Sequence, residues 1–156
     1  MQQLTNLQIT FTPAAIEQMK AEQERYKQER VEVMERLKTA REMGDLSENG
    51  AYKYAKFELG RISRQLKYLS SMLENAVPQD KPINSQVVGF GSQVTIKSDS
   101  DQHSFTMVNQ FESDLTANKL SLQSPLGTAL VGKSAGDQIS VDTPSGTLQY
   151  TIVGVK

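Results

Sequence analysis

The chain has 156 residues, no cysteine and a formal net charge of -1, with 17 Lys and Arg against 18 Asp and Glu. This length allows one ordinary domain or two small ones, and the lack of cysteine excludes disulfides and thiolate metal sites within the chain. A net charge near zero excludes nucleic-acid binding through overall charge, so any such contact requires a local basic patch.

The N-terminal stretch, Met1 to Asn6, carries neither the basic region nor the apolar run of a secretory signal. The chain also contains no apolar run of membrane-spanning length, and the lack of cysteine fits a reducing compartment. We therefore expect a cytoplasmic protein that makes no contact with a membrane.

Composition changes sharply near residue 77. Of the 65 residues from 13 to 77, 23 are charged, against 12 of the 79 that follow, and seven of the ten glycines lie in that second part. Residues 78–82 hold two of the five prolines, which cannot continue a helix. These shifts predict an α+β protein with a helical domain over residues 1–77, a linker at 78–82 and a β-rich domain over 83–156.

Residues 13–77 show the periodicity of two helices. Thr12 and Pro13 are typical of a helix start, with Thr as N-cap and Pro at the first helical position. The first helix repeats apolar residues at intervals of seven: Met19, Tyr26, Val33 and Ala40. The second steps by three or four through Tyr52, Ala55, Leu59, Ile62, Leu66, Leu69, Leu73 and Ala76. Two such stripes joined by a short turn predict an antiparallel coiled-coil hairpin.

The turn between these helices is acidic and allows two interpretations. In the first, Gly44 ends the first helix, Asp45 or Ser47 caps the second, and Glu48 lies in its first turn, where the helix dipole favours negative charge. In the second, Asp45 and Glu48 supply part of the oxygen shell of a Mg²⁺ ion whose other ligands come from a partner. Spacing alone leaves both interpretations open.

A basic stripe follows the turn. On a helical wheel its members fall within an arc of roughly 140°, opposite the apolar stripe. They are Lys53, Lys56, Arg61, Arg64 and Lys67. Such a stripe is either a solvated helix face or a surface that follows a phosphate backbone toward the acidic turn.

Residues 83–156 show the alternation of half-buried antiparallel strands. The alternating pairs and triplet are Val94/Ile96, Phe105/Met107, Ile139/Val141 and Leu148/Tyr150/Ile152. Ser124 as N-cap, Pro125 at the first position and Gly132 as a left-handed stop predict one short helix. His103, the only histidine, has no partner pattern for nucleophilic catalysis.

Both halves carry motifs of one family. Ala40-Arg41-Glu42, Gly44 to Asn49 and Tyr52 resemble the coiled-coil tip of the bacterial Gre transcript-cleavage factors. Ser124-Pro125, Ala129-Leu130, Gly132-Lys133, Gly136-Asp137, Thr143-Pro144, Gly146 and Tyr150 resemble the C-terminal domain of that family. The resemblance covers essentially the whole chain and implies that the C-terminal domain has an FKBP-like fold.

The resemblance also implies a function. The C-terminal domain would dock on the rim of the secondary channel of bacterial RNA polymerase, and the hairpin, acting as a monomer, would reach the active centre and the 3′ end of the nascent RNA. Asp45 and Glu48 match the acidic pair that helps hold a second Mg²⁺ for endonucleolytic cleavage of backtracked RNA. The chain would thus be a cofactor protein in transcription, not an enzyme by itself.

The resemblance assigns further residues by position. Arg41, Ser47, Asn49 and Tyr52 match tip positions that shape the turn or approach the RNA, and Gln123, Ser124 and Pro125 match the polymerase-docking loop. The chain departs from the common pattern at Gln123, where Asn or Asp is usual, and at Gly50-Ala51, where a small residue and an acid are usual.

Two alternatives follow from the same residues. The departures fit a homologue that binds the channel and inhibits the polymerase without cleaving RNA, although both Asp45 and Glu48 are present. A prolyl isomerase is the other alternative, since FKBP-like domains elsewhere have that activity, but such a site needs an apolar pocket lined by aromatic residues.

Overall fold

The computed structural model describes residues 7–156, so Met1 to Asn6 and the expectation about a secretory signal lie outside the described residues. The chain forms two compact units, one made of Ile16–Ala76 and the other of Gln8–Ala15 with Val77–Lys156. Residues 8–15 thus group with the C-terminal part, although they precede the first helix in sequence. Within residues 7–156, no helix is long and apolar enough to cross a membrane.

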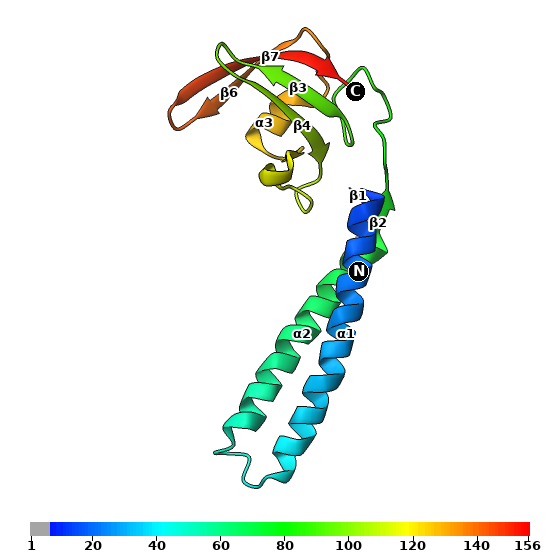
Figure 1. The fold of residues 1–156 in the computed structure, drawn as a ribbon, viewed down its shortest axis with the longest axis vertical. Helices are drawn as coiled ribbons and strands as arrows, with labels where there is room; N and C mark the ends of the chain where they lie inside the picture. The colour runs from blue at the N-terminus through cyan, green and yellow to red at the C-terminus, as the bar shows by residue number, and fades with distance from the viewer. Residues whose placement is uncertain (1–6) are drawn as a thin grey trace, which may run out of the picture. The chain divides into compact units, whose positions relative to one another are not determined.

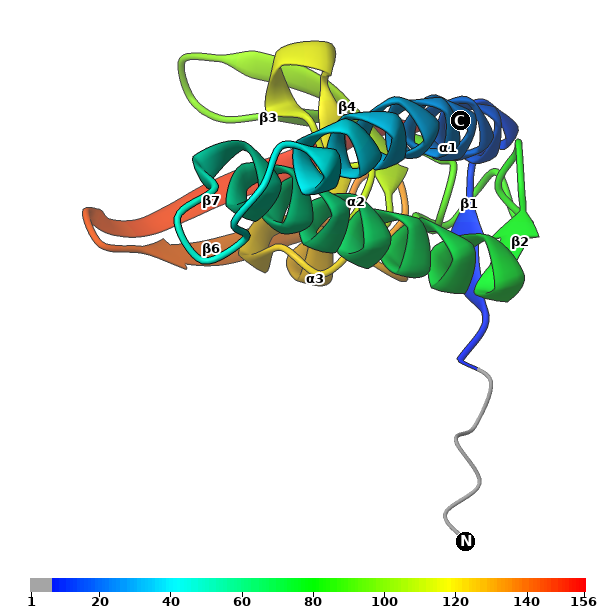
Figure 2. The same cartoon turned by 90° about the horizontal axis from the view of Figure 1, so that it is seen from below.

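The first unit is a helical hairpin, as the heptad spacing predicts. Helix α1 (Pro13–Glu42) and helix α2 (Gly50–Asn75) lie side by side in both views (Figures 1 and 2). The buried residues of its core are Tyr26, Val33, Ala55, Ile62 and Leu69, with Met19, Leu37, Leu59 and Leu66 packed against them. The seam has a polar position where the heptad pattern fails, and there the Gln23 side-chain amide donates to Ser70 Oγ at 2.9 Å.

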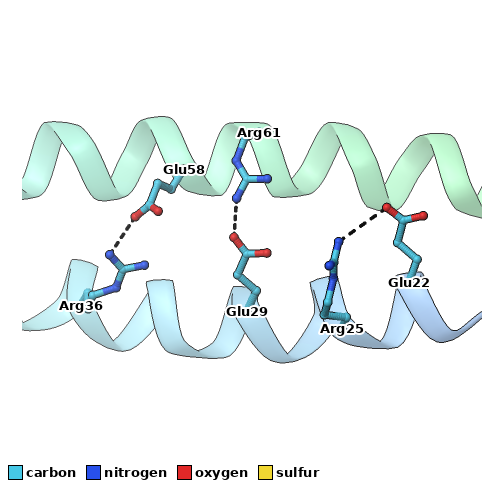
Figure 3. Close-up of polar contacts among 6 residues, drawn as sticks. All are labelled: Glu22, Arg25, Glu29, Arg36, Glu58 and Arg61. Atoms are coloured by element: carbon cyan, nitrogen blue, oxygen red, sulfur yellow. Dashed lines mark hydrogen bonds and ion pairs between the residues drawn. The ribbon is translucent and has the colours of Figure 1, made fainter.

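Two ion pairs cross the hairpin and fix its antiparallel register (Figure 3). Arg36 Nη1 lies 2.9 Å from Glu58 Oε2, and Arg61 contacts Glu29. A third pair, Arg25 with Glu22, lies within α1 at 3.7 Å. Partly exposed pairs of this kind contribute little to stability, so the apolar seam is the main source of hairpin stability and the ion pairs set which residues lie level.

The second unit is built on a five-stranded sheet with the order β5-β4-β3-β7-β6. Its strands are β3 (Gln93–Lys97), β4 (Gln102–Val108), β5 (Lys119–Ser121), β6 (Gln138–Thr143) and β7 (Gly146–Val155). All four strands expected from alternation are present, which confirms the fold class. The sheet is mixed, because β5 pairs with β4 in parallel while the other pairs are antiparallel.

The core of this unit lies between the sheet and helix α3 (Pro125–Leu130). Its buried apolar residues are Val88, Val94, Ile96, Met107, Leu120, Leu130, Ile139, Val141 and Ile152. Alternation explains most of them, since inward residues recur at every second position. His103 is exposed on β4, where its ring stacks on Phe105 at a centroid distance of 6.1 Å.

Two short strands are not evident in the sequence. Strand β1 (Ile9–Phe11) pairs with β2 (Ala76–Pro78), directly after α2 ends at Asn75. Three-residue strands are too short to show alternation, and Pro78 is tolerated because an edge strand does not need every N–H. The two-stranded sheet lies where the expected linker begins.

The start of α1 is held within the second unit. Thr12 accepts a hydrogen bond from the Ala15 amide at 3.2 Å, which confirms its predicted role as N-cap. The Thr12 amide in turn donates to Glu112 Oε2 at 3.1 Å, and the side-chain amide of Asn109 donates to the Thr10 carbonyl at 2.5 Å. Phe11, which is 1% exposed, packs beside the ring of Phe111. These contacts explain why residues 8–15 group with the C-terminal part.

Candidate functional site at the hairpin tip

The acidic turn begins where α1 ends. The Met43 amide still bonds to the Ala40 carbonyl at 3.2 Å, but Gly44 has a φ of 120°. A side chain would be strained at that angle, so a glycine here ends the helix and redirects the chain. The prediction that Gly44 ends the first helix is confirmed.

The residue that caps α2 is Asn49, so the prediction that Asp45 or Ser47 would do so is wrong. The Asn49 side-chain oxygen accepts the Tyr52 amide at 3.0 Å. Glu48 accordingly precedes the helix instead of lying in its first turn. The physical reason is that the Asp45 carboxylate accepts both the amide and the hydroxyl of Ser47 in a local turn, and the helix begins only after Asn49.

Asn49 also reaches back to the first helix. Its side-chain Nδ2 donates at 2.6 Å to the Ala40 carbonyl near the end of α1, which also accepts the Met43 amide. One half-buried side chain therefore closes both helix ends. The turn that carries Asp45 and Glu48 is held at both of its ends by the same residue.

Within the turn, Ser47 orients Asp45. The Ser47 amide and hydroxyl both donate to Asp45 Oδ1, at 2.9 and 2.8 Å. These bonds, the backbone one first, lower the pKa of Asp45 below its ordinary value, because they stabilise the ionised carboxylate. Asp45 and Glu48 are both exposed, so the turn presents two carboxylates to solvent.

The donor set at the tip fits part of a magnesium site. Mg²⁺ takes oxygen ligands and is usually held by one or two carboxylates together with waters and phosphates. Over residues 7–156, no group of three or more His, Cys, Asp or Glu side chains is placed to hold a metal ion. Asp45 and Glu48 have the chemistry of metal ligands, but in number they make only part of a coordination shell.

A cationic cluster adjoins the acidic turn around Tyr52. The guanidinium carbon of Arg41 lies 5.9 Å from the centre of the Tyr52 ring, and Lys56 Nζ lies 5.5 Å from it. Both distances are within the range of cation–π attraction. The predicted tip residues Arg41, Ser47, Asn49 and Tyr52 are thus brought together: two hold the turn and two form this cluster.

The basic stripe divides into two parts. Lys53, Lys56, Arg64 and Lys67 are exposed and form no salt bridge within the described part of the chain. Arg61 differs, because its guanidinium reaches across the hairpin to Glu29 and lies over Tyr26. The hydrogen bond that Arg61 donates to the Glu29 carboxylate raises the pKa of Arg61. The wheel places Arg61 at the edge of the stripe, and its long side chain turns toward the other helix.

Exposed aromatic residues that the charge pattern does not predict interrupt this stripe. Tyr54, Phe57 and Tyr68 are 60%, 66% and 47% exposed. Together with Arg61 and Arg64 they follow one another at intervals of three or four, which places them along one flank of α2. That spacing is visible in the sequence and could have revealed a face that mixes cations with flat apolar rings.

The residues expected to form a docking loop precede α3. Ser124 Oγ accepts the Gly127 amide at 3.0 Å, which confirms it as the predicted cap, and donates its proton to the Ser121 carbonyl at 2.7 Å. Gln123 and Pro125 are exposed on either side of it. The predicted stop at Gly132 is confirmed by its φ of 77°.

Fold and tip together define a two-part protein in which a helical hairpin carries an exposed acidic turn and a mixed sheet forms the second unit. Residues 9–77 match the family described as transcription elongation factor, N-terminal, and residues 83–156 match transcription elongation factor, GreA/GreB, C-terminal. The chain therefore belongs to the GreA/GreB family of transcription elongation factors, which confirms the resemblance seen in the sequence.

The sequence of the chain is similar to those of individual relatives over most of their length. The chain is 37% identical to the transcription elongation factor GreA of Thermosipho africanus over 95% of this chain and 96% of that protein. It is 38% identical to GreA of Thermotoga maritima over 94% and 96% of the two chains. Among solved structures, the GreA factor homolog 1 (Gfh1) of Thermus thermophilus is 28% identical over 96% of this chain and 99% of that one, with a TM-score of 0.45.

Proposed function

We propose that the chain binds bacterial RNA polymerase, inserts its hairpin into the secondary channel and stimulates cleavage of backtracked nascent RNA. One observation carries the proposal: two carboxylates are exposed on a turn that Asn49 holds at both ends, and Ser47 keeps one of them oriented. A turn that served only to connect two helices would not require such a construction around its acidic residues.

In this proposal Asp45 and Glu48 contribute ligands to a Mg²⁺ ion shared with the polymerase. When bound, such an ion activates water and stabilises the charge that develops on phosphate oxygens. The role of the chain is to deliver two ionised carboxylates in fixed positions. The two hydrogen bonds from Ser47, which lower the pKa of Asp45, support that role because they hold the ionised carboxylate in one orientation. Catalysis itself would belong to the polymerase.

The exposed basic and aromatic residues of α2 would contact the displaced RNA. Lys53, Arg64 and Lys67 are positioned to neutralise phosphates, and the rings of Phe57 and Tyr68 are exposed enough to stack on bases. Arg61 is excluded from this role by its pairing with Glu29. Lys56 and Arg41 flank Tyr52 and would act nearest to the acidic turn.

Docking on the rim of the channel would use the loop before α3. Because the Ser124 hydroxyl is satisfied within the loop, we propose that Ser124 holds the loop in shape while Gln123 and Pro125 make the contacts. Gln123 is itself tied to Ser121, whose hydroxyl donates to the Gln123 side-chain oxygen at 3.0 Å. The amide NH₂ of Gln123 is the group left to face a partner.

The proposal is tested with a backtracked elongation complex in the presence of Mg²⁺. The wild-type chain should release short 3′ RNA fragments, and Asp45→Asn and Glu48→Gln should each reduce release strongly while polymerase binding is retained. Asp45→Asn is the informative variant, because Asn keeps an oxygen for the Ser47 bonds and removes only the charge. Unchanged transcripts at saturating wild-type protein would reject cleavage.

A channel-binding factor that does not cleave is the second candidate. It is favoured by Gly50 and Ala51, which leave the first turn of α2 without an acidic residue. The same assay separates the two, since a factor of this kind would bind the polymerase and slow elongation without producing fragments.

A further inference from the structure

The hairpin tip carries two cations and two carboxylates, and no ion pair joins them. Arg41, Lys56, Asp45 and Glu48 form no salt bridge in the part of the chain that the structure describes. Farther along α1, three other cations each pair with a glutamate three residues before them. Arg41 and Asp45 are only four residues apart and stay separate. The tip therefore keeps its opposite charges apart.

Both sides of this separation have a visible cause. On the carboxylate side, the amide and hydroxyl of Ser47 already bond to Asp45 Oδ1. On the cation side, the guanidinium carbon of Arg41 lies 5.9 Å from the centre of the Tyr52 ring, and Lys56 Nζ lies 5.5 Å from it. The face of an aromatic ring attracts cations at these distances. One ring therefore holds a cation from each helix.

The ring of Tyr52 is itself held in place. Its amide donates to the side-chain oxygen of Asn49 at 3.0 Å, so its backbone belongs to the cap that also ties the turn to α1. Tyr52 is half-buried in the first turn of α2, whereas the cations and carboxylates around it are exposed. A fixed ring among mobile charged side chains can determine where those side chains lie.

We propose that Tyr52 is a positioning residue, whose ring keeps Arg41 and Lys56 from neutralising the carboxylates of Asp45 and Glu48 and presents both cations to a phosphate group. This inference rests on the proposed function, in which the two carboxylates contribute to a Mg²⁺ site. A metal ion with a phosphate beside it offers a positive and a negative group together, and the tip has free charges of the opposite sign for each. Pairing within the tip would remove both contacts.

NMR of the isolated full-length chain tests the positioning role. Protons over an aromatic face are shifted upfield, so the Hδ protons of Arg41 and the Hε protons of Lys56 should be shifted in the wild type and in Tyr52→Phe, and not in Tyr52→Leu. Mn²⁺, added as a paramagnetic probe, should broaden the signals of the acidic turn. Tyr52→Leu should require about two- to fivefold more Mn²⁺ for the same broadening, because the ion must then displace an exposed ion pair of ordinary strength.

Tyr54→Leu is the matched control for this experiment. It removes a ring that is 60% exposed, two residues away, over which no cation lies within residues 7–156. The control should require no more Mn²⁺ than the wild type. An unchanged Mn²⁺ requirement in Tyr52→Leu, or an equal rise in Tyr54→Leu, would overturn the proposal.

The backtracked elongation complex then separates this proposal from the proposed function. Tyr52→Leu should raise the Mg²⁺ concentration for half-maximal cleavage, leave the chain concentration that half-saturates the polymerase unchanged, and recover at high Mg²⁺. Tyr52→Phe should behave as the wild type. A defect that Mg²⁺ does not relieve would show a merely structural role and contradict the proposal. If the wild type releases no fragments, the proposed function fails, and the Mn²⁺ comparison still decides the role of Tyr52.

Discussion

The side-chain amide of Asn49 donates to the main-chain carbonyl of Ala40 at 2.6 Å, across the turn that joins the two helices. The oxygen of the same amide accepts the Tyr52 amide and caps the second helix. An Asn can do both because its side chain carries a donor NH₂ group and an acceptor oxygen on separate atoms, whereas an ionised Asp only accepts. The position of the acidic turn therefore depends on one amide side chain.

The first prediction concerns this amide. Asn49→Ala should lower the free energy of local unfolding at the tip by about 1–2 kcal/mol, because it removes a helix cap and a cross-helix hydrogen bond. Hydrogen exchange of the Tyr52 amide, measured by NMR, is the direct readout. Asn49→Asp is the matched control: it keeps the cap and loses only the donor to Ala40, so protection should fall less. Equal protection in all three proteins would contradict the double role.

The second prediction concerns the pKa of Asp45. Ser47→Ala should raise it toward the ordinary value, because the hydroxyl bond is lost while the backbone bond remains. A depressed pKa in the folded state stabilises the turn above the pKa of the unfolded chain, and this contribution is lost as pH falls through the folded pKa. The turn should therefore loosen only in acid, and at a higher pH in the variant.

NMR titration of the Asp side-chain carboxyls measures both effects. Asp114 is an internal control, since Thr116 lowers its pKa through a side-chain and a backbone hydrogen bond in the same way. Its titration should not move in Ser47→Ala. A parallel shift of both groups would indicate a general change in the protein, and an unchanged Asp45 would mean that the hydroxyl does not determine its pKa.

The third prediction separates two arginines of one stripe. Arg61→Ala should lower the melting temperature of the hairpin modestly, because it breaks the pair with Glu29 and removes a ring contact with Tyr26. Arg64→Ala should leave the melting temperature unchanged and weaken binding of single-stranded RNA, with a smaller dependence of affinity on salt. Thermal unfolding followed by circular dichroism, together with an RNA titration, distinguishes the roles. The reverse pattern would show that the assignment is wrong.

The fourth prediction concerns the loop before α3. A Cβ at Gly127 would lie 1.9 Å from the Ser121 carbonyl oxygen, so Gly127→Ala forces the backbone apart and should cost more than about 2 kcal/mol of stability. At Gly132 an added Cβ would touch no neighbour, but the backbone φ of 77° is strained for an alanine. Gly132→Ala should therefore cost only about 1 kcal/mol of stability. Urea unfolding followed in the C-terminal unit compares them. Similar costs at the two positions would contradict the close approach at Ser121.

The sequence by itself determined the regular parts of this protein. Heptad spacing from Met19 to Ala76 specified the hairpin, because only two facing helices can bury both stripes. Alternation specified four of the five strands of the large sheet, and the Ser124-Pro125 pair with Gly132 specified the short helix. The two carboxylates of the turn are also visible in the sequence, since metal ligands and helix caps draw on the same few residue types.

Only the tertiary structure decided how the side chains of the turn divide their tasks. Asp45, Ser47 and Asn49 all have a high propensity for the N-cap position. Asn49 is the residue that also bonds to the carbonyl of Ala40, nine residues away, and local sequence spacing does not predict a contact at that distance. The pairing of Arg61 with Glu29 likewise depends on hairpin register, and the parallel pairing of β5 depends on long-range order in the sheet. Local pattern fixes which residues are buried along an element, whereas hydrogen bonds and charges between elements depend on where the chain returns.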